Sequence, residues 1–423
     1  MKGATTLKYK IEKVAVLGSG VMGSQIAAHL ANAGINSYLL DIVPNELTEE
    51  EKAKGLTLDS SIVRNRFVNK GLDFAKTIKP AAFFDPKFTE RITVGNFEDN
   101  LKWVSEVDWI IEVVVERLEP KKELLAKVDK LRKPGTIVTS NTSGISVNEM
   151  SEGLSEDFKK HFLGTHFFNP PRYLKLLEII PTAHTSTEVI NFISEFGDKI
   201  LGKGIVTCKD TPNFIANRIG MFAMLHSLRV MLEDDLNIVE VDKIAGPATG
   251  KPKSALFRTL DVVGIDTCVH VARNIFDNVP NDEKRDVFTM PDFVETMLQN
   301  KWFGQKTKQG FYKKVGKDIL YLDHKTMEYQ PSPKVKYPSL ENAKNIEKLT
   351  ERMASLAYAD DKAGKFVWKT LSDTLIYSAN RIPEISDNIV NIDNAMKWGF
   401  GWELGPFESW DAIGVEKSVQ KMK

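Results

Sequence analysis

Residues 13–41 read KVAVLGSGVMGSQIAAHLANAGINSYLLD, and this stretch decides the fold of the first part of the chain. A valine-rich apolar run leads into three closely spaced glycines. An alanine-rich helical segment then extends from Gln25 to Ala33, and a second apolar strand runs from Asn36 to Leu40. Strand, turn, helix and strand in this order predict a βαβ unit, which joins two parallel strands through a helix.

Four further apolar runs, with helical segments between them, continue this pattern at residues 92–94, 109–114, 137–140 and 163–168. Alternating strands and helices predict an α/β domain whose parallel sheet is covered by helices on both faces. Residues 46–85 interrupt the alternation, and their glutamate- and lysine-rich segments predict an exposed helical hairpin inserted after the second strand. A long solvated loop is the alternative for this insertion.

The glycine-rich turn, GSGVMG at residues 18–23, follows a predicted strand and opens a predicted helix, which is the context of a dinucleotide-binding GxGxxG motif. Gly18 permits the tight turn, Gly20 lets the backbone approach a pyrophosphate, and Gly23 lets the helix pack on the strand. The carboxylate of Asp41, at the end of the second strand, would accept both ribose hydroxyls and repel a 2′-phosphate. The pattern predicts a Rossmann-type domain that binds NAD rather than NADP, and a plain glycine turn beside a surface aspartate is the alternative. The residues expected at the cofactor are Gly18, Gly20, Val21, Met22, Gly23 and Asp41.

The second half of the chain has a different sequence pattern. Residues 213–232 form a long, mostly apolar segment that predicts a helix, and no strand-like alternation lies near it. We therefore predict a first domain over residues 1–207 and an all-helical domain over 208–315. Three prolines make residues 316–345 a predicted linker or irregular loop, and a second helical domain is predicted over 346–423.

An internal repeat links the two helical regions. Five residues of the first region recur in the second with the same spacing, apart from a one-residue shift between the glycine and the phenylalanine. Such a match predicts a duplicated helical half-domain, with chance similarity between helical segments as the alternative. The recurring residues are Asp242, Gly250, Phe257, Asp261 and Gly264, which return as Asp393, Gly401, Phe407, Asp411 and Gly414.

Four polar side chains are candidates for chemistry. Ser143 follows a predicted strand, and ligands of open α/β sheets bind beyond the carboxyl ends of the strands; an ordinary helix cap or turn is the alternative. His166 lies near the end of a predicted strand, and Glu178 follows inside an apolar run, where a carboxylate needs a partner. The two would form a general base or, alternatively, a structural contact. Asn217, on the long helix, could reach a substrate oxygen or simply bridge two helices.

The composition limits the classes of function. Acidic and basic residues balance at 57 each, so bulk charge gives no reason to propose binding to nucleic acid or to a membrane surface. Two cysteines are too few for a disulfide framework or a metal cluster, and no zinc spacing or P-loop lysine is visible, so we expect no metal site. We see no signal-peptide stretch, membrane-spanning run or peroxisomal address, and we expect a cytoplasmic protein.

Five motifs in this order resemble the L-3-hydroxyacyl-CoA dehydrogenase family of fatty-acid β-oxidation, in particular the dehydrogenase part of bacterial multifunctional enzymes. The resemblance covers nearly the whole chain. The motifs are GSGVMG at 18–23, Ser-Asn-Thr-Ser at 140–143, His-Phe-Phe-Asn-Pro at 166–170, Lys-Asp-Thr-Pro at 209–212 with Asn217-Arg218, and the segment from Lys306 to Phe311.

The resemblance implies a role for each candidate. His166 would remove the proton of the 3-hydroxyl, with Glu178 as its orienting acid. Ser143 would bind the substrate oxygen near the nicotinamide, and Asn217 would help to hold the substrate. The family reaction oxidises a (3S)-3-hydroxyacyl-CoA thioester to the 3-ketoacyl-CoA, with hydride passing from C3 to NAD. Further residues stand where the family contacts NAD, namely Asp41, Glu116, Lys121 and Lys306.

The chain also departs from the family pattern. Single-function members end soon after the segment equivalent to residues 310–312, whereas this chain continues to residue 423 and resembles the second helical copy of multifunctional enzymes. That copy could occupy the surface through which single-function members dimerise, which would give a monomer, and a homodimer is the alternative. Trp368 stands at the position equivalent to Asn217, so we expect no catalytic role for the second copy. No enoyl-CoA hydratase module is visible, and one could be missing from this chain.

Two other functions stay open beside the dehydrogenase. A related β-hydroxyacid dehydrogenase would act on a free acid, but its usual base is a lysine, and the predicted pair of His166 and Glu178 argues against it. A non-catalytic NAD-binding or scaffold subunit of a β-oxidation complex would need none of the site residues, and all of them are present.

Overall fold

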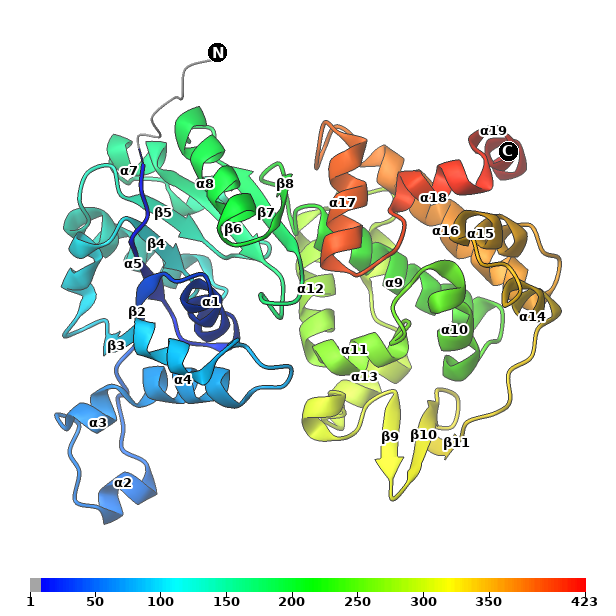
Figure 1. The fold of residues 1–423 in the computed structure, drawn as a ribbon. Helices are drawn as coiled ribbons and strands as arrows, with labels where there is room; N and C mark the ends of the chain where they lie inside the picture. Colours follow the sequence, from blue (N-terminus) through cyan, green and yellow to red (C-terminus); the bar gives the residue numbers. More distant parts are fainter. Residues whose placement is uncertain (1–8) are drawn as a thin grey trace. The chain divides into compact units, whose positions relative to one another are not determined.

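The chain forms two compact units, Met1–Asp210 and Thr211–Lys423, and the computed structural model describes residues 9–423 of it (Figure 1). The first unit is built on an eight-stranded sheet, and the second is mostly helical. The predicted fold class, a Rossmann-type sheet domain followed by helical domains, is confirmed. Within residues 9–423, no helix combines the length and the apolar character needed to cross a membrane.

The sheet of the first unit has the strand order β3-β2-β1-β4-β5-β6-β7-β8. The first six strands along the chain are parallel, as the βαβ pattern predicts, whereas β6 and β7 are antiparallel and β8 runs parallel to β7. The segment between β6 and β7 is too short for a crossover helix, and a short connection gives an antiparallel neighbour. The sequence did not predict β8. The strands are β1 Lys13–Leu17, β2 Asn36–Asp41, β3 Ile92–Asn96, β4 Trp109–Glu112, β5 Ile137–Ser140, β6 Phe162–Phe167, β7 Leu176–Pro181 and β8 Gly204–Thr207.

Both faces of this sheet are buried. Alternate residues such as Val14, Val16 and Ile111 join a core with side chains of α1, α4 and α8. Ala15 and Ile110 lie between them on the opposite face and are equally buried. Two-sided burial explains why the strands read as near-continuous apolar runs. The helices of this unit are α1 Val21–Asn32, α2 Glu49–Ala53, α3 Ser61–Arg64, α4 Arg66–Thr77, α5 Leu118–Leu131, α6 Val147–Met150, α7 Glu156–Lys160 and α8 Thr187–Lys199, with 3-10 turns η1 Pro86–Arg91 and η2 Leu101–Glu106.

Two helical segments of the first unit differ from their prediction. Helix α1 begins at Val21, ahead of the predicted start, because glycine is a poor helix former and Gly23 masks the first turn. In the insertion, α4 packs against α1 rather than standing in solvent. A Cβ added to Gly71 of α4 would lie 2.1 Å from the carbonyl oxygen of Ser19. The predicted exposed hairpin over 46–85 is therefore wrong for α4, which belongs to the core of the unit.

The second unit contains two groups of helices, and α16 packs along α9. Helix α9 begins at Ala216 and not at residue 213, because Asn213 and Phe214 have φ values of 62° and 51°, which a right-handed helix excludes. The first group is α9 Ala216–Glu233, α10 Ile238–Ile244, α11 Phe257–Val263, α12 Ile265–Asn278 and α13 Asp292–Gln299, with turns η3 Pro247–Thr249, η4 Arg285–Phe288 and η5 Gln305–Thr307. The second group is α15 Leu349–Ala357, α16 Lys362–Asn380, α17 Ile389–Gly399, α18 Pro406–Ile413 and α19 Val415–Met422.

Residues 316–345, predicted as a linker or irregular loop, contain regular structure. Strands β9 (Tyr312–Val315), β10 (Asp318–Asp323) and β11 (Glu328–Pro331) form an antiparallel sheet, and helix α14 (Pro338–Ala343) follows. Two of the three prolines lie at element boundaries, where a missing N–H costs little: Pro331 ends β11 and Pro338 begins α14, whereas Pro333 lies between these elements. The prediction of an irregular loop is therefore wrong for most of this segment.

The repeated residues have the same structural role in both groups of helices. We name residues 216–278 the first helical copy and residues 362–422 the second helical copy. Asp242 accepts hydrogen bonds from the backbone N–H groups of Leu256 and Phe257 at 3.0 and 2.7 Å. Asp393 accepts them from Phe407 and Glu408 at 2.8 and 3.2 Å. In each copy an aspartate therefore ties one helix to the start of the next.

Contacts between the two copies come in reciprocal pairs. By the residue offset of the repeat, Phe222 corresponds to Asp373, and His226 corresponds to Tyr377. Phe222 stacks on Tyr377 with ring centroids 3.8 Å apart, and His226 Nε2 lies 2.8 Å from Asp373 Oδ2. A contact that recurs with its two partners exchanged is the signature of two-fold symmetry. The helical copies therefore pair as the subunits of a symmetric dimer do.

Candidate active site

A histidine and a glutamate face each other across strands β6 and β7. His166 and Glu178 are direct partners in the antiparallel register, so their side chains leave the sheet on the same face. His166 Nδ1 lies 2.7 Å from Glu178 Oε2, and both side chains are buried. A carboxylate at Nδ1 favours the tautomer whose Nε2 carries the lone pair, and it stabilises the imidazolium after proton uptake. The arrangement is that of an oriented general base.

The end of β6 is fixed by its neighbours. Asn141, directly after β5, accepts a hydrogen bond from the backbone N–H of Phe167 through Oδ1 at 2.9 Å. The rings of Phe168 and His166 are 4.5 Å apart between centroids. The backbone and the ring of the histidine are thus both held, which is what a base of defined direction requires.

Ser143 lies in a polar network at the end of β5. Its backbone N–H donates to Glu116 Oε1 at 2.8 Å, and its hydroxyl donates to the same oxygen at 3.3 Å. Thr142 Oγ1 also donates to Glu116, at 2.6 Å, and Lys121 Nζ lies 3.2 Å from the other carboxylate oxygen. Burial alone would raise the pKa of Glu116, but Lys121 and these hydrogen bonds outweigh it and lower the pKa. Glu116 is therefore an anion that orients Ser143.

Lys121 is held in turn by Glu112, the last residue of β4. Both side chains are buried, and Lys121 Nζ lies 2.8 Å from Glu112 Oε1. Burial lowers the pKa of Lys121, but Glu112 and Glu116 together raise it above its usual value. Glu112 also accepts hydrogen bonds from the hydroxyl of Ser140 and from the backbone N–H of Val114, at 2.5 and 2.7 Å. The lysine thus joins two carboxylates, one at the end of β4 and one in the segment that follows it, into one network.

The glycine-rich turn forms a cradle for a dinucleotide. Gly18 has a φ of 111°, and a Cβ added there would lie 2.4 Å from the carbonyl oxygen of Val113. A Cβ on Gly23 would lie 1.9 Å from the carbonyl oxygen of Gly18, whereas one on Gly20 would meet nothing within 4 Å. The first and third glycines therefore close the turn against the protein, and the second leaves its backbone open to a phosphate. These residues fit NAD.

Asp41 lies in a pocket of about 380 Å³ beside this turn. Its carboxylate accepts hydrogen bonds from the backbone N–H of Ser19 at 2.8 Å, from the Ser19 hydroxyl, and from the backbone N–H of Ile42 at 2.7 Å. Val21 also lines the pocket, whereas Met22 packs against the core of the unit. The full lining is Ser19, Gly20, Val21, Asp41, Ile42, Phe67, Lys70, Gly71 and Phe74.

Two further predicted site residues, Asn217 and Lys306, belong to the second unit. Asn217 lies in the first turn of α9 and is half-buried, and its side chain has no hydrogen-bond partner among residues 9–423. Lys306 Nζ forms an ion pair with Asp266 at 2.6 Å. The first unit thus brings together two predicted groups, His166 with Glu178 and Ser143 with Glu116 and Lys121.

Comparison with known proteins assigns the family. A family model described as "3-hydroxyacyl-CoA dehydrogenase, NAD binding domain" matches residues 13–211, and one described as "3-hydroxyacyl-CoA dehydrogenase, C-terminal domain" matches residues 214–314. A "Probable 3-hydroxyacyl-CoA dehydrogenase" of Deinococcus radiodurans is 44% identical over 306 residues, which cover 72% of this chain and 84% of that protein. The chain belongs to the 3-hydroxyacyl-CoA dehydrogenase family. The predicted family, and NAD as its cofactor, are thereby confirmed.

Some relatives in this dehydrogenase family are longer. A "Probable 3-hydroxyacyl-CoA dehydrogenase" of Bacillus subtilis (strain 168) is 57% identical over 413 residues, which cover 98% of this chain and 52% of that protein. The chain therefore spans about half the length of this relative. The crystal structure of 3-hydroxybutyryl-CoA dehydrogenase from Escherichia coli K12 matches with a TM-score of 0.67 at 20% identity, over 98% of this chain and 95% of that chain. That likeness extends to the fold of the second helical copy.

Sequence reasoning missed two charged residues near the candidate site residues, Glu112 beside Lys121 and Lys70 in the pocket of Asp41. A signal existed for Glu112, because a carboxylate inside the apolar run of residues 110–114 needs a buried partner, as Glu178 does. No signal existed for Lys70, because only the packing of α4 on α1 brings this lysine to the pocket of Asp41.

Proposed function

We propose that this chain oxidises the 3-hydroxyl of a (3S)-3-hydroxyacyl-CoA to the 3-ketoacyl-CoA, with NAD as the hydride acceptor. The observation that carries the proposal is the buried pair of His166 and Glu178, with 2.7 Å between Nδ1 and Oε2. A buried imidazole held by a carboxylate has the features of a general base for a hydroxyl proton. Family membership supports the same reaction.

We assign a separate role in this reaction to each of several residues. His166 takes the hydroxyl proton at Nε2 as the carbonyl double bond forms at C3, and Glu178 stabilises the imidazolium that results. Ser143, held by Glu116 through its backbone N–H, turns its hydroxyl from Glu116 to the substrate oxygen and donates a hydrogen bond there, and Asn217 helps to hold the substrate. Bound NAD supplies the hydride acceptor. Asp41 favours NAD over NADP, because the 2′-phosphate of NADP would place its negative charge against the carboxylate of Asp41.

The test is NADH formation by the purified chain, with NAD or NADP and with the 3S and 3R forms of a short 3-hydroxyacyl-CoA. We expect turnover of the 3S form with NAD only. His166→Ala should lower turnover by about 10²-fold or more, because the base is lost. The matched control is His184→Ala, which removes an exposed histidine and should leave turnover unchanged. A wild-type chain that binds NAD without turnover would instead support a scaffold subunit, or an active site that needs a further module.

We also propose that the chain is a monomer whose second helical copy takes the place of a second subunit. The reciprocal contacts of Phe222 with Tyr377 and of His226 with Asp373 support this proposal. The surface of the first copy that would pair with another chain is then already covered. Sedimentation equilibrium should give the mass of one chain, and a mass twice as large would reject the proposal. An enoyl-CoA hydratase module in a longer form of the protein stays a proposal too.

A further inference from the structure

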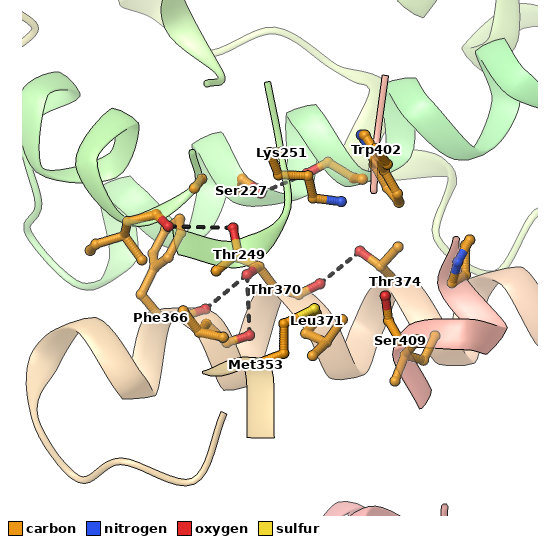
Figure 2. Close-up of a pocket in the computed structure, with 16 residues that line it drawn as sticks. Ser227, Thr249, Lys251, Met353, Phe366, Thr370, Leu371, Thr374, Trp402 and Ser409 are labelled. Atoms are coloured by element: carbon orange, nitrogen blue, oxygen red, sulfur yellow. Dashed lines mark hydrogen bonds between the residues drawn. The ribbon is translucent and has the colours of Figure 1, made fainter. Parts of the chain in front are cut away.

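A cavity lies between the two helical copies, within the second unit (Figure 2). It offers about 70 Å³ to the centres of water-sized molecules, which is room for about five waters. Residues of α9, of the end of α10 and of the segment after it form one wall, and residues of α15, α16, α18 and the segment before α18 form the other. Its lining is Ala223, Ser227, Ile244, Ala245, Thr249 and Lys251 from the first half of the unit, and Met353, Phe366, Val367, Thr370, Leu371, Thr374, Leu375, Trp402, Pro406 and Ser409 from the second.

The repeat explains why the side chains leave a space here. By the offset of the repeat, Thr249 corresponds to Phe400, and Leu371 corresponds to Gly220. On the filled side of the pseudo-two-fold, the ring of Phe400 lies so close to Gly220 that an added Cβ would meet it at 2.2 Å. On the side of the cavity, Thr249 and Leu371 take the places of Phe400 and Gly220, and the space that the Phe400 ring fills is open. The cavity is therefore a difference between two related halves and not a general packing fault of the fold.

A lysine faces the cavity where the other copy has a tryptophan. Lys251 corresponds to Trp402, and its Nζ lies over the Trp402 ring (Figure 2). Across the described residues, the cavity lining contains no aspartate or glutamate, and Nζ has no hydrogen-bond partner. Burial holds the pKa of Lys251 well below its usual value. Lys251 is partly buried, and charging its amine there without a counter-charge costs free energy, which an anion from solution would recover.

The hydroxyl groups around the lysine favour a ligand of mixed character. Ser227, Thr370 and Thr374 each donate to a backbone carbonyl of their own helix, at 2.7, 2.9 and 2.7 Å, so they present lone pairs to the cavity. The hydroxyl of Ser409 has no partner among residues 9–423 and can donate. One amine, which a bound anion would keep protonated, and one free hydroxyl donor lie among walls that are otherwise largely apolar. This combination suits a negative headgroup joined to a short hydrocarbon.

We propose that the cavity binds a short-chain monocarboxylate of about five or six non-hydrogen atoms, such as propionate or butyrate. The carboxylate pairs with the ammonium group of Lys251 and accepts a hydrogen bond from Ser409. The hydrocarbon lies against Ile244, Met353 and Leu371. This site is separate from the one under the proposed function and does not depend on it.

Thermal unfolding and titration calorimetry with sodium butyrate test the proposal, with sodium chloride at equal ionic strength and the neutral isostere butyramide as controls. Butyrate should raise the melting temperature in a saturable way, with half-saturation at about 1 mM, because a ligand of this size binds weakly. Butyramide should bind at least about tenfold more weakly. No saturable effect of butyrate, or an equal effect of butyramide, overturns the proposal.

Three variants locate the effect. Lys251→Met keeps the length of the side chain without the charge, and it should abolish the response to butyrate. Thr249→Phe places in the cavity the ring that fills the equivalent space of the repeat, here against Leu371, and should abolish it too. Lys253→Met removes an exposed lysine of the same segment and should keep the wild-type response. A butyrate response that survives in Lys251→Met overturns the proposal even if Thr249→Phe fails to fold.

Discussion

The first and second helical copies share the residues that fix the backbone of the half-domain, but they differ at other side chains. Both keep the aspartate that accepts backbone N–H groups from the next helix, Asp242 in one and Asp393 in the other. Both keep a left-handed glycine, Gly250 and Gly401, each with a φ of 67°. These residues recur because a backbone hydrogen bond or a positive φ admits few substitutes.

The copies differ at one position that contacts a further segment of the chain and at one that we propose holds the substrate. Asp261 of the first copy accepts hydrogen bonds from the backbone N–H groups of Phe311 and Tyr312 at 2.8 and 2.9 Å, whereas Asp411 is exposed. Asn217 of the first copy is replaced by Trp368. Comparing the copies therefore separates residues that build the helical half-domain from residues that serve something specific to one copy.

Burial of charge also differs between the copies. Arg218 and its counterpart Lys369 each form an ion pair that crosses between the copies, with Glu384 and Asp234 respectively. Arg218 is fully buried and also pairs with Asp282, which has no exposed side-chain surface. Lys369 is about half exposed. A buried charge that loses its partner has no water to replace it, whereas an exposed one does.

The largest difference between the copies is expected in the loss of unfolding free energy when Arg218→Met is compared with Lys369→Met. Loss of a partner from a buried pair costs 3–5 kcal/mol in general, and we expect about 3 kcal/mol here, because Tyr377 and Arg381 still donate to Asp282. Lys369→Met should cost at most about 1 kcal/mol. Urea unfolding measures both. Equal losses would show that the two pairs are equivalent and that burial does not set the difference.

A smaller effect is expected on turnover from Asn217→Ala set against Trp368→Ala. If Asn217 holds the substrate, its loss should lower kcat/KM by about 10-fold to 100-fold, as expected for one hydrogen bond that strengthens in the transition state. Trp368→Ala should leave kcat/KM unchanged at a temperature where circular dichroism shows both variants folded. A loss of turnover in the tryptophan variant would contradict the assignment of chemistry to the first copy alone.

Local sequence patterns predicted the fold of the first unit better than the fold of the second. The βαβ unit, the glycine turn and the spacing of His166 and Glu178 are local signals, and the structure places that pair in direct register. Strand β8 is only four residues long and lacked a clear apolar run. Glu112 and the packing of α4 depend on contacts between segments distant in the chain. The cavity depends on a comparison of residues in two copies, which the repeat made possible but composition and periodicity did not show.

The smallest effect is one of pH, and it separates Asp261 from Asp411. Burial raises the pKa of Asp261 to about 7, against the opposing hydrogen bonds from Phe311 and Tyr312. A carboxyl group whose pKa is higher in the folded than in the unfolded chain binds more protons when folded. Its contribution to stability is therefore complete below about pH 4 and is lost as the pH rises through about 7.

The test is the unfolding free energy of Asp261→Asn between pH 5 and pH 8. Asparagine does not titrate, so over this range the unfolding free energy of the variant should fall less than that of wild type, by on the order of 2 kcal/mol. Asp411→Asn should follow the wild-type profile, and parallel profiles for all three proteins would mean that Asp261 stays ionised throughout, its two backbone hydrogen bonds outweighing burial.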